Sequence, residues 1–349
     1  MNTATCPGLP APIVPGQPLT ALAPMQDVTT AGFMGLVADI GAPDFFFTEF
    51  IRVHSQTRPE TLEAPALEAR PGGRPVFAQL IGNDPALLAR AATALLARGA
   101  AGIDLNLGCP APKVFRKNVG GGLLRDLPRV DEILAALREA VPGVLSVKTR
   151  VGFESAAGFD DLLGLLAKRG VNLVSLHGRT VAQLYRGPVD HALIARAVGA
   201  LPCPVLANGE ITSAAGAARV LGETGAAGVM LGRHAIRNPW VFAQLRAVLA
   251  DKPPPVVTLG DVRRYVDQLA GLTRRDGAPD RAHANRVKKF LNFTGQSVDP
   301  GGRFLNEMRR ARTVAELLAV CDRHLLAEPD APFALEPFPG VVARPNCEG

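Results

Sequence analysis

The sequence predicts an α/β protein, a (β/α)8 TIM barrel followed by a small all-helical C-terminal domain. Eight short β-like apolar runs alternate with segments of helical length, which is the pattern of a parallel sheet. The count of eight favours a closed barrel over an open doubly wound sheet, the alternative that periodicity alone leaves open. After about Trp240 the β-like runs stop and amphipathic helical patterns follow, which indicates the second domain.

The predicted strands are short apolar runs with polar residues at their ends. In chain order they cover 19–25, 44–50, 75–82, 102–109, 145–152, 173–179, 204–210 and 228–234. The predicted helices between them include 85–99, 129–141, 160–170 and 212–225. Thr212 or Ser213 is a suitable N-cap for the last of these helices, and Gly225 is a suitable C-terminal stop.

Composition divides the chain into four segments. A Pro-rich N-terminal tail covers 1–18, the barrel 19–245, the helical domain 255–328 and a Pro-rich C-terminal tail 329–349. The stretch 252–257 contains three consecutive prolines and is typical of a linker. Within the helical domain we expect helices over 259–275, 282–293 and 313–326.

The composition excludes several classes of protein. Hydrophobic residues are 47% of the 349 residues and charged residues 20%, so the chain can bury a large core. No apolar run approaches the roughly 18–20 residues of a membrane-spanning helix, and the N-terminus lacks the pattern of a secretion signal. The five cysteines are scattered and form no metal-type cluster: Cys6, Cys109, Cys203, Cys321 and Cys347. We therefore expect a cytoplasmic protein without a metal, a disulfide framework or a membrane partner.

The net charge of +6 indicates an anionic partner, and the distribution of charge shows where that partner would bind. Residues 281–312 hold eight basic side chains and two acidic ones, which accounts for the whole excess. A solvated helix face is the usual reason for such a run. Because the surplus lies entirely in the helical domain, we expect this domain to bind the anion.

Polar residues stand at the end of every predicted strand. They are Pro24-Met25-Gln26, Thr48-Glu49, Gln79, Asn106 with Cys109, Lys148 with Arg150, His177 with Arg179, Asn208-Gly209-Glu210 and Gly232-Arg233. In a barrel these C-terminal strand ends share one face, where catalytic residues collect. Buried polar groups without partners cost about 1–3 kcal/mol each, so we expect one polar ligand to occupy this face.

The types of residue indicate which ligand fits. The glycine turns after the seventh and eighth strands, with Arg233, suit a terminal phosphate. Lys148 and His177 would then lie over the middle of the ligand, and the amides of Gln79 and Asn106 could bind a heteroaromatic edge. FMN satisfies these requirements, and no GxGxxG turn of a dinucleotide fold is present. A structural ion pair of Lys148 with a strand-end glutamate, Glu210 or Glu49, is the alternative.

Cys109 differs from the other cysteines in its surroundings. It follows a strand, lies between Gly108 and Pro110, and precedes the basic residues Lys113, Arg116 and Lys117. A loop thiol at a barrel mouth is a candidate acid or nucleophile. No Ser-His-Asp or zinc spacing accompanies it, which disfavours hydrolysis and metal chemistry.

Nine segments together resemble the tRNA-dihydrouridine synthases. They are APM, TEF, FAQLIG, DLNLGCPAPKV followed by GGGLL, VKTRVG, HGRT, ANGEI and GRHAIRNPW, which run from about Leu19 to Trp240. The combination of GCPxxKV, a glycine-rich LL and HGRT is highly specific for that family. TEFIRV, ANGE and RVKKF are most similar to the bacterial C type, which acts on the D-loop uridine at position 16 of tRNA.

The resemblance implies a cofactor site and a reaction. FMN would be bound by Pro24, Met25, Gln26, Gln79, Lys148, His177, Asn208, Gly209, Glu210, Gly232 and Arg233. NADPH or NADH would reduce the flavin, whose N5 would deliver a hydride to C6 of a uridine, while Cys109 would protonate C5. The sequence departs from the family at Gln26-Asp27, where the relatives have Glu-Gly. This departure bears on Gln26 as a flavin contact and on the choice of uridine.

The resemblance also implies tRNA as partner. No oligomer is implied, so we expect a monomer. The implied tRNA contacts are Arg52, Asn106, Arg179, Tyr185, Arg286, Lys288, Phe293 and Arg309, with Asn106 and Tyr185 close to the uridine. The main alternative is an FMN barrel oxidoreductase of the dihydroorotate dehydrogenase kind, acting on a free pyrimidine. An RNA-binding protein without catalysis is disfavoured by Cys109, Lys148 and His177. A phosphate-sugar isomerase without flavin leaves Cys109 and the basic helical domain unexplained.

Overall fold

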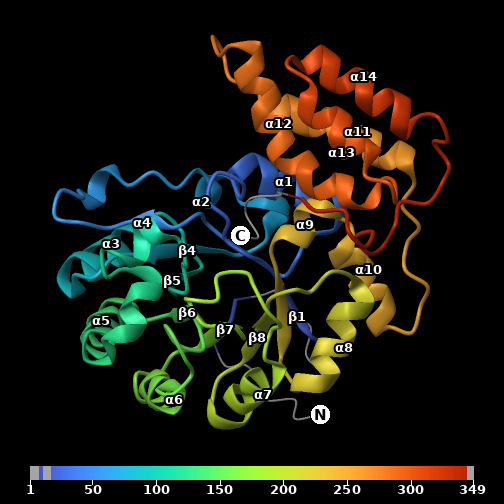
Figure 1. Ribbon diagram of the computed structural model, residues 1–349. Helices are drawn as coiled ribbons and strands as arrows, with labels where there is room; N and C mark the ends of the chain where they lie inside the picture. Colours follow the sequence, from blue (N-terminus) through green and yellow to red (C-terminus); the bar gives the residue numbers. More distant parts are fainter. Residues whose placement is uncertain (1–7, 11–16, 344–349) are drawn as a thin grey trace. The chain divides into compact units, whose positions relative to one another are not determined.

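The computed structural model describes residues 8–10 and 17–343 (Figure 1). Cys6, Cys347 and the outer parts of both predicted tails therefore lie outside the described residues. The chain forms two compact units. Of the described residues, the first comprises 8–10, 17–35, 42–210 and 219–232, and the second comprises 36–41, 211–218 and 233–343.

The first unit contains a closed parallel barrel, as the strand count predicts. Eight strands form it: β1 (Leu19–Leu22), β2 (Phe45–Phe47), β4 (Val76–Ile81), β5 (Gly102–Leu107), β6 (Val144–Arg150), β7 (Leu173–His177), β8 (Val205–Asn208) and β9 (Gly228–Leu231). Neighbouring strands pair in parallel, and the pairings β1–β9 and β2–β4 close the ring. A short additional strand, β3 (Ile51–Arg52), pairs with the end of β4.

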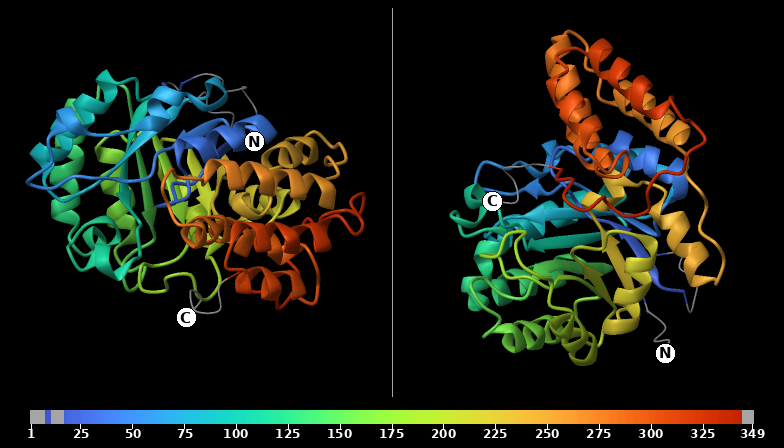
Figure 2. Two further views of the ribbon diagram at one scale, coloured as in Figure 1. Left: turned by 90° about the horizontal axis from the view of Figure 1, so that it is seen from above. Right: turned by 45° about the vertical axis from the view of Figure 1, so that its right-hand side comes forward.

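Helices connect the strands along the chain and surround the barrel (Figure 2). The elements up to β9 are α1 (Ala31–Gly41), η1 (Pro59–Thr61), α2 (Pro65–Ala69), η2 (Pro71–Gly73), α3 (Pro85–Ala97), α4 (Pro112–Phe115), η3 (Gly120–Arg125), α5 (Leu127–Ala140), α6 (Phe159–Lys168), α7 (His191–Ala200) and α8 (Ala214–Thr224). Side-chain caps begin several of them, because a carboxylate or hydroxyl satisfies an N–H group that the first helical turn leaves unpaired. Ser213, one of the two expected caps of α8, accepts a hydrogen bond from Gly216, and Gly225 follows the helix with a φ of +66°.

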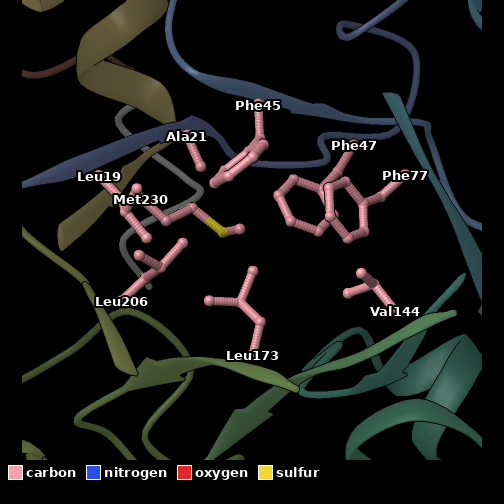
Figure 3. Close-up of a cluster of buried hydrophobic side chains, with 10 residues drawn as sticks. Leu19, Ala21, Phe45, Phe47, Phe77, Val144, Leu173, Leu206 and Met230 are labelled. Carbon is pink, nitrogen blue, oxygen red and sulfur yellow. The ribbon is translucent and has the colours of Figure 1, made fainter. Parts of the chain in front are cut away.

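Apolar side chains fill the amino-terminal end of the barrel interior (Figure 3). The cluster consists of Leu19, Ala21, Ala23, Phe45, Phe47, Phe77, Val144, Leu173, Leu206 and Met230. The Phe47 and Phe77 rings stack with their centroids 4.9 Å apart, while the Phe45 and Phe77 rings meet edge to face at 5.5 Å. Such a layer of bulky side chains makes the barrel a packed core and leaves only its other end for a ligand.

The second unit is helical. It contains α9 (Arg233–Arg237), α10 (Val241–Leu249), α11 (Leu259–Leu272), α12 (Asp280–Thr294), η4 (Gly295–Ser297), α13 (Arg303–Arg310) and α14 (Val314–Leu325). Helices α11, α12 and α14 correspond to the three predicted helices, whereas α13 was not expected from the sequence. The eight residues of α13 are rich in charge, so that only a short apolar face of Phe304, Leu305 and Met308 identifies it. No helix in the described ranges is long and apolar enough to span a membrane.

Arg237 binds the described part of the C-terminal tail within this unit. Its guanidinium is completely buried and donates to Ser297 Oγ at 2.5 Å, Ala334 O at 3.2 Å and Leu335 O at 2.7 Å. Desolvation lowers its pKa to about 10. Phe333, in the same stretch, is 3% exposed and its N–H donates to Val257 O at 2.8 Å. The tail segment therefore forms part of the packed unit.

Candidate active site

The barrel interior changes from apolar to polar towards the carboxyl ends of its strands, which we call the barrel mouth. Alternate residues of a strand point the same way, so the residues two and four positions after a core side chain also face inwards. These inward positions carry Gln79, Asp104, Asn106, Ser146, Lys148, Ser175, His177 and Asn208. The expected gathering of polar strand ends is therefore present, and it extends deeper into the barrel than the sequence analysis anticipated.

A chain of hydrogen bonds connects the buried interior to the backbone of Gly108 and Cys109, which we call the Cys109 segment. Asp104 Oδ2 accepts from Gln79 Nε2 at 2.7 Å, and Gln79 Oε1 accepts from Asn106 Nδ2 at 2.8 Å. Asn106 Oδ1 in turn accepts the backbone N–H groups of Gly108 at 3.1 Å and Cys109 at 2.9 Å. We call this series the carboxamide relay. Gln79 and Asn106, both predicted from the sequence, are thus bonded in one series with the carboxylate of Asp104, which the sequence analysis did not identify.

Asp104 is fully buried, and its environment sets its charge. Desolvation raises the pKa of its carboxyl to about 6, although hydrogen bonds from Ser146 and Gln79 and the charge of Lys148 oppose this shift. Ser146 Oγ donates to Asp104 Oδ1 at 2.6 Å. Both of its oxygens accept hydrogen bonds, which is the arrangement of an ionised carboxylate. Strand alternation was the sequence signal that could have identified Asp104, because it lies two residues before Asn106 on the same strand.

Lys148 projects into the barrel mouth next to Asn208. Its Nζ donates to Asn208 Oδ1 at 2.9 Å, and Asn208 Nδ2 donates to Met230 O at 2.7 Å. Desolvation and the nearby Arg150 lower the pKa of the Lys148 ammonium to about 8. The alternative ion pairs of Lys148 are absent among the described residues, because Glu210 pairs with Arg179 and Glu49 accepts from Gln26.

His177 and Arg179 pack against the turn after β8. The Arg179 side chain is completely buried, and its guanidinium donates to Gly187 O at 2.5 Å and pairs with Glu210 at 2.6 Å. Gly209 has a φ of +116°, and a Cβ atom there would lie 2.6 Å from His177 Cδ2. Only glycine therefore allows the turn to approach the imidazole this closely.

The end of β1 and the end of β9 lie beside each other. Met25 N donates to Thr29 Oγ1 at 2.9 Å, and the following Gln26 donates to Glu49 at 2.9 Å. A Cβ atom at Gly232 would meet Met25 Sδ at 3.6 Å, an ordinary van der Waals contact. Pro24 precedes Met25 in this segment and is partly exposed.

The Cys109 segment is held from several sides. Gly121 N donates to Cys109 O at 3.2 Å, and the thiol-bearing residue is itself partly buried. Arg150 is 2% exposed and donates to Gly108 O at 3.1 Å and Leu184 O at 2.6 Å. Its guanidinium also lies 5.5 Å from the ring centre of Tyr185. Arg150 therefore joins the segment before Cys109 to the loop that carries Tyr185.

The predicted tRNA contacts fall into two groups. Arg52, Asn106, Arg179 and Tyr185 belong to the first unit, and Arg286, Lys288, Phe293 and Arg309 to the second. Tyr185 is 41% exposed, and Arg52 is exposed with its guanidinium 5.4 Å from the Phe50 ring centre. Arg233, a predicted phosphate ligand, begins α9 and falls in the second unit, directly after Gly232 in the chain.

In the second unit the predicted contacts already have internal partners. Lys288 Nζ donates to Arg309 O at 3.0 Å and to Ala311 O, and so satisfies carbonyls at the end of α13. Arg309 donates to Asn292 Oδ1 at 2.9 Å and to Val342 O at 2.7 Å. Arg286 Nε donates to Thr273 O at 2.7 Å, and Phe293 is 9% exposed.

Other cations of this unit point towards solvent. Arg281, Arg310 and Arg312 are exposed, and none of them has an ion-pair partner in the described part of the chain. Lys288 lies close to all three. Its ammonium donates to the carbonyl of Ala311, which stands between Arg310 and Arg312 in the chain. Desolvation and, as a smaller contribution, the charge of Arg281 lower the pKa of this ammonium. We call these four residues the cationic patch. Across residues 8–10 and 17–343, no group of His, Cys, Asp and Glu is arranged to hold a metal ion.

Comparison with known proteins gives consistent matches. The family described as "Dihydrouridine synthase (Dus)" matches residues 21–328. The tRNA-dihydrouridine(16) synthase of Cupriavidus necator is 35% identical over 337 residues, 93% of this chain and 98% of the relative. That of Ralstonia nicotianae is 32% identical over 318 residues, 88% of this chain and 95% of the relative. The solved structure of the old yellow enzyme homologue from Zymomonas mobilis (NCR) aligns at 14% identity with a TM-score of 0.44, over 68% of this chain and 89% of that chain, too remote a likeness to support an inference.

Proposed function

This chain belongs to the dihydrouridine synthase family, and on that premise we propose that it reduces U16 in the D-loop of tRNA to 5,6-dihydrouridine. Besides family membership, one observation on the structure supports the proposed reaction. The barrel mouth brings a held thiol segment, a lysine of lowered pKa and a ring of amide donors to one place. The relatives that match nearly the whole chain are named for position 16, which supports that uridine.

The donor set at the mouth fits a flavin, and we assign FMN. Gln79 donates one of its two amide N–H groups to Asp104, and Lys148 donates one of its ammonium N–H groups to Asn208. Gln79 and Lys148 therefore each keep a donor for the polar edge of the flavin ring. Pro24, Met25 and Gln26 would lie along the ring, with His177 beside it. The ribityl chain and phosphate would be held by Asn208, Gly209, Glu210, Gly232 and Arg233. When bound, FMN would carry a hydride from NADPH or NADH to C6 of the uridine.

Cys109 would act as the general acid. Its Sγ would give a proton to C5 of the uridine, on the face opposite the hydride donor. Its N–H donates to Asn106 Oδ1 and its C=O accepts from Gly121 N, and these two bonds hold the residue in position for this transfer.

In this proposal the cationic patch binds the phosphates of tRNA. Exposed arginines without internal partners are free to form charge-assisted bonds to phosphate oxygens. Lys288 and Arg309 hold α13 in place and add to the positive potential. A base in folded tRNA is stacked, so U16 must be extruded before it can enter the barrel mouth, where Tyr185 and Asn106 would meet it. Arg179 is buried and paired with Glu210, so we assign it to the turn after β8 and not to the RNA surface.

The test is reduction of unmodified tRNA by the full-length protein. Purified protein loaded with FMN is incubated with NADPH or NADH and a tRNA transcript that has uridine at position 16, and dihydrouridine is mapped by mass spectrometry. A transcript with cytidine at that position, free uridine and orotate serve as controls. We expect product at position 16 alone. Product at another position would overturn the assignment of U16, and equal reduction of orotate would favour the free-pyrimidine reading. A colourless protein that takes up no FMN would overturn the flavin assignment.

A further inference from the structure

The carboxamide relay has a direction, which Asp104 fixes at the buried end and the N–H groups of Gly108 and Cys109 fix at the other end. An ionised carboxylate can only accept hydrogen bonds, so Gln79 must turn its NH2 group towards Asp104 and its oxygen towards Asn106. Asn106 must then turn its NH2 group towards Gln79, which leaves its oxygen facing the N–H groups of Gly108 and Cys109. In the opposite orientation, the NH2 group of Asn106 would face two backbone donors.

We propose that Asp104 is a positioning residue that fixes both carboxamides of the relay and thereby the backbone carrying Cys109. The inference rests on the proposed function, which gives the positioned thiol its task. Asp104 lies too deep for contact with tRNA, since its side chain is completely buried below Asn106 on β5. Its effect on the reaction therefore passes through Gln79 and Asn106.

The relay also limits what Asn106 can offer a substrate. Its Oδ1 already accepts two N–H groups, and one of its own two N–H groups is bound to Gln79. One N–H donor remains. Asn106 is thus confined to binding a carbonyl oxygen of the base, and an exocyclic amino group at that place would meet a donor. This polarity favours a carbonyl oxygen over an amino group at that place, and both ends of the relay fix it.

Burial strengthens the hydrogen bonds that the charged Asp104 carboxylate accepts. Gln79, like Asp104, is completely buried, so water does not compete for the bonds between them. The Ser146 hydroxyl donates to the second carboxylate oxygen. Because a hydroxyl can also accept, it could accept from an NH2 group that replaces this oxygen in an asparagine variant. Asparagine at position 104 could therefore still accept from Gln79, but without the negative charge that strengthens the bond.

Four variants of the full-length protein separate these roles. Asp104→Leu removes every acceptor at the buried end, and Asp104→Asn keeps the size and one acceptor but removes the charge. Gln79→Met breaks the relay and leaves the carboxylate in place, which keeps the test valid if Asp104→Leu fails to fold. Ser175→Ala is the matched control, because this hydroxyl is buried inside the same barrel and has no hydrogen-bond partner among the described residues.

Two measurements report on the Cys109 segment without requiring turnover. Hydrogen exchange followed by mass spectrometry monitors the amides of Gly108 and Cys109. Alkylation by iodoacetamide monitors the thiol, with the partly exposed Cys203 of the same molecule as internal reference. For Asp104→Leu and Gln79→Met we expect roughly tenfold faster exchange of these two amides, the effect of losing about one hydrogen bond's free energy, and faster alkylation of Cys109 relative to Cys203. Asp104→Asn should give an intermediate increase, and Ser175→Ala none.

The outcomes distinguish this proposal from the proposed function. If Asp104→Leu exchanges like the wild type, the proposal is overturned even where the enzyme reduces tRNA. If exchange accelerates equally along β6 and β7, Asp104 is a general stabiliser of the barrel and the proposal is also overturned. Acceleration confined to the Cys109 segment supports the proposal, including in a protein that proves inactive on tRNA.

Discussion

Replacing Gly209 with alanine should disturb the barrel mouth through one added carbon atom. The φ of +116° at this position is strained for any L-residue and costs about 1–3 kcal/mol. The new Cβ would also lie 2.6 Å from His177 Cδ2 and 2.9 Å from Val189 Cγ2, whereas ordinary contacts begin at 3.4 Å. Relieving this overlap requires the imidazole to move by most of an ångström, which in a packed interior costs about 1–3 kcal/mol more.

The expected result is a loss of about 2–6 kcal/mol in the free energy of unfolding of the barrel and weaker FMN binding, because His177 leaves its place. Thermal denaturation should show the midpoint falling by at least about 5 °C, and flavin fluorescence should report the affinity. Gly222→Ala is the matched control. Gly222 lies within α8, an added Cβ there has no atom within 4 Å, and helix propensity predicts a gain of up to about 1 kcal/mol. If Gly209→Ala keeps both the midpoint and the flavin affinity, the close approach of the turn to His177 is refuted.

Three further predictions concern the acid, the RNA-binding surface and the relay. Cys109→Ala should keep its flavin and lose about 10²–10⁴-fold in turnover on unmodified tRNA, and undiminished turnover would remove Cys109 from the acid role. Arg310→Ala with Arg312→Ala should weaken tRNA binding and reduce the slope of log affinity against log salt by about 2, measured by filter binding, while Arg90→Ala on exposed α3 should leave the slope unchanged. The pKa of Asp104 is raised on folding from 3.8 to about 6, so its ionisation opposes folding. Relative to Asp104→Asn, the wild type should therefore lose up to about 3 kcal/mol of unfolding free energy as pH rises from about 4 to 6, and parallel denaturation curves over that range would contradict the buried carboxylate.

The fold was predictable because period-2 and helical patterns alternate without interruption along the barrel. The strand-end residues were predictable for the same reason, since parallel strands bring their carboxyl ends to one face. Asp104 was not identified, although strand alternation places it on the same face as Asn106, because its role depends on its partners Gln79 and Ser146, which lie on other strands. Arg150 was noted as a strand-end residue, but its bonds to Gly108 and Leu184 depend on how the loops pack.

The basic segment shows a different limit of sequence reasoning. The count of charges predicted the helical unit as the anion-binding part, and exposed arginines are indeed present there. The sequence could not distinguish cations that face solvent from cations that support the fold. Lys288 and Arg309 bind backbone carbonyls. Arg310 and Arg312, which the sequence analysis counted only as part of the basic segment, have no such partners among the described residues.

The contacts of Arg237 bear on how the gene can be trimmed for expression. A boundary placed after α14, where the last helix ends, would remove Ala334 and Leu335 and with them two of the carbonyls that solvate this guanidinium. Each buried N–H left without an acceptor costs about 1–3 kcal/mol, and the Nη1 and Nη2 atoms of Arg237 would keep only Ser297 Oγ and Thr212 O among their described partners. Truncation at the visible end of the helices should therefore yield a poorly folded product, and an affinity tag is better appended beyond residue 343 than substituted for the segment that precedes it.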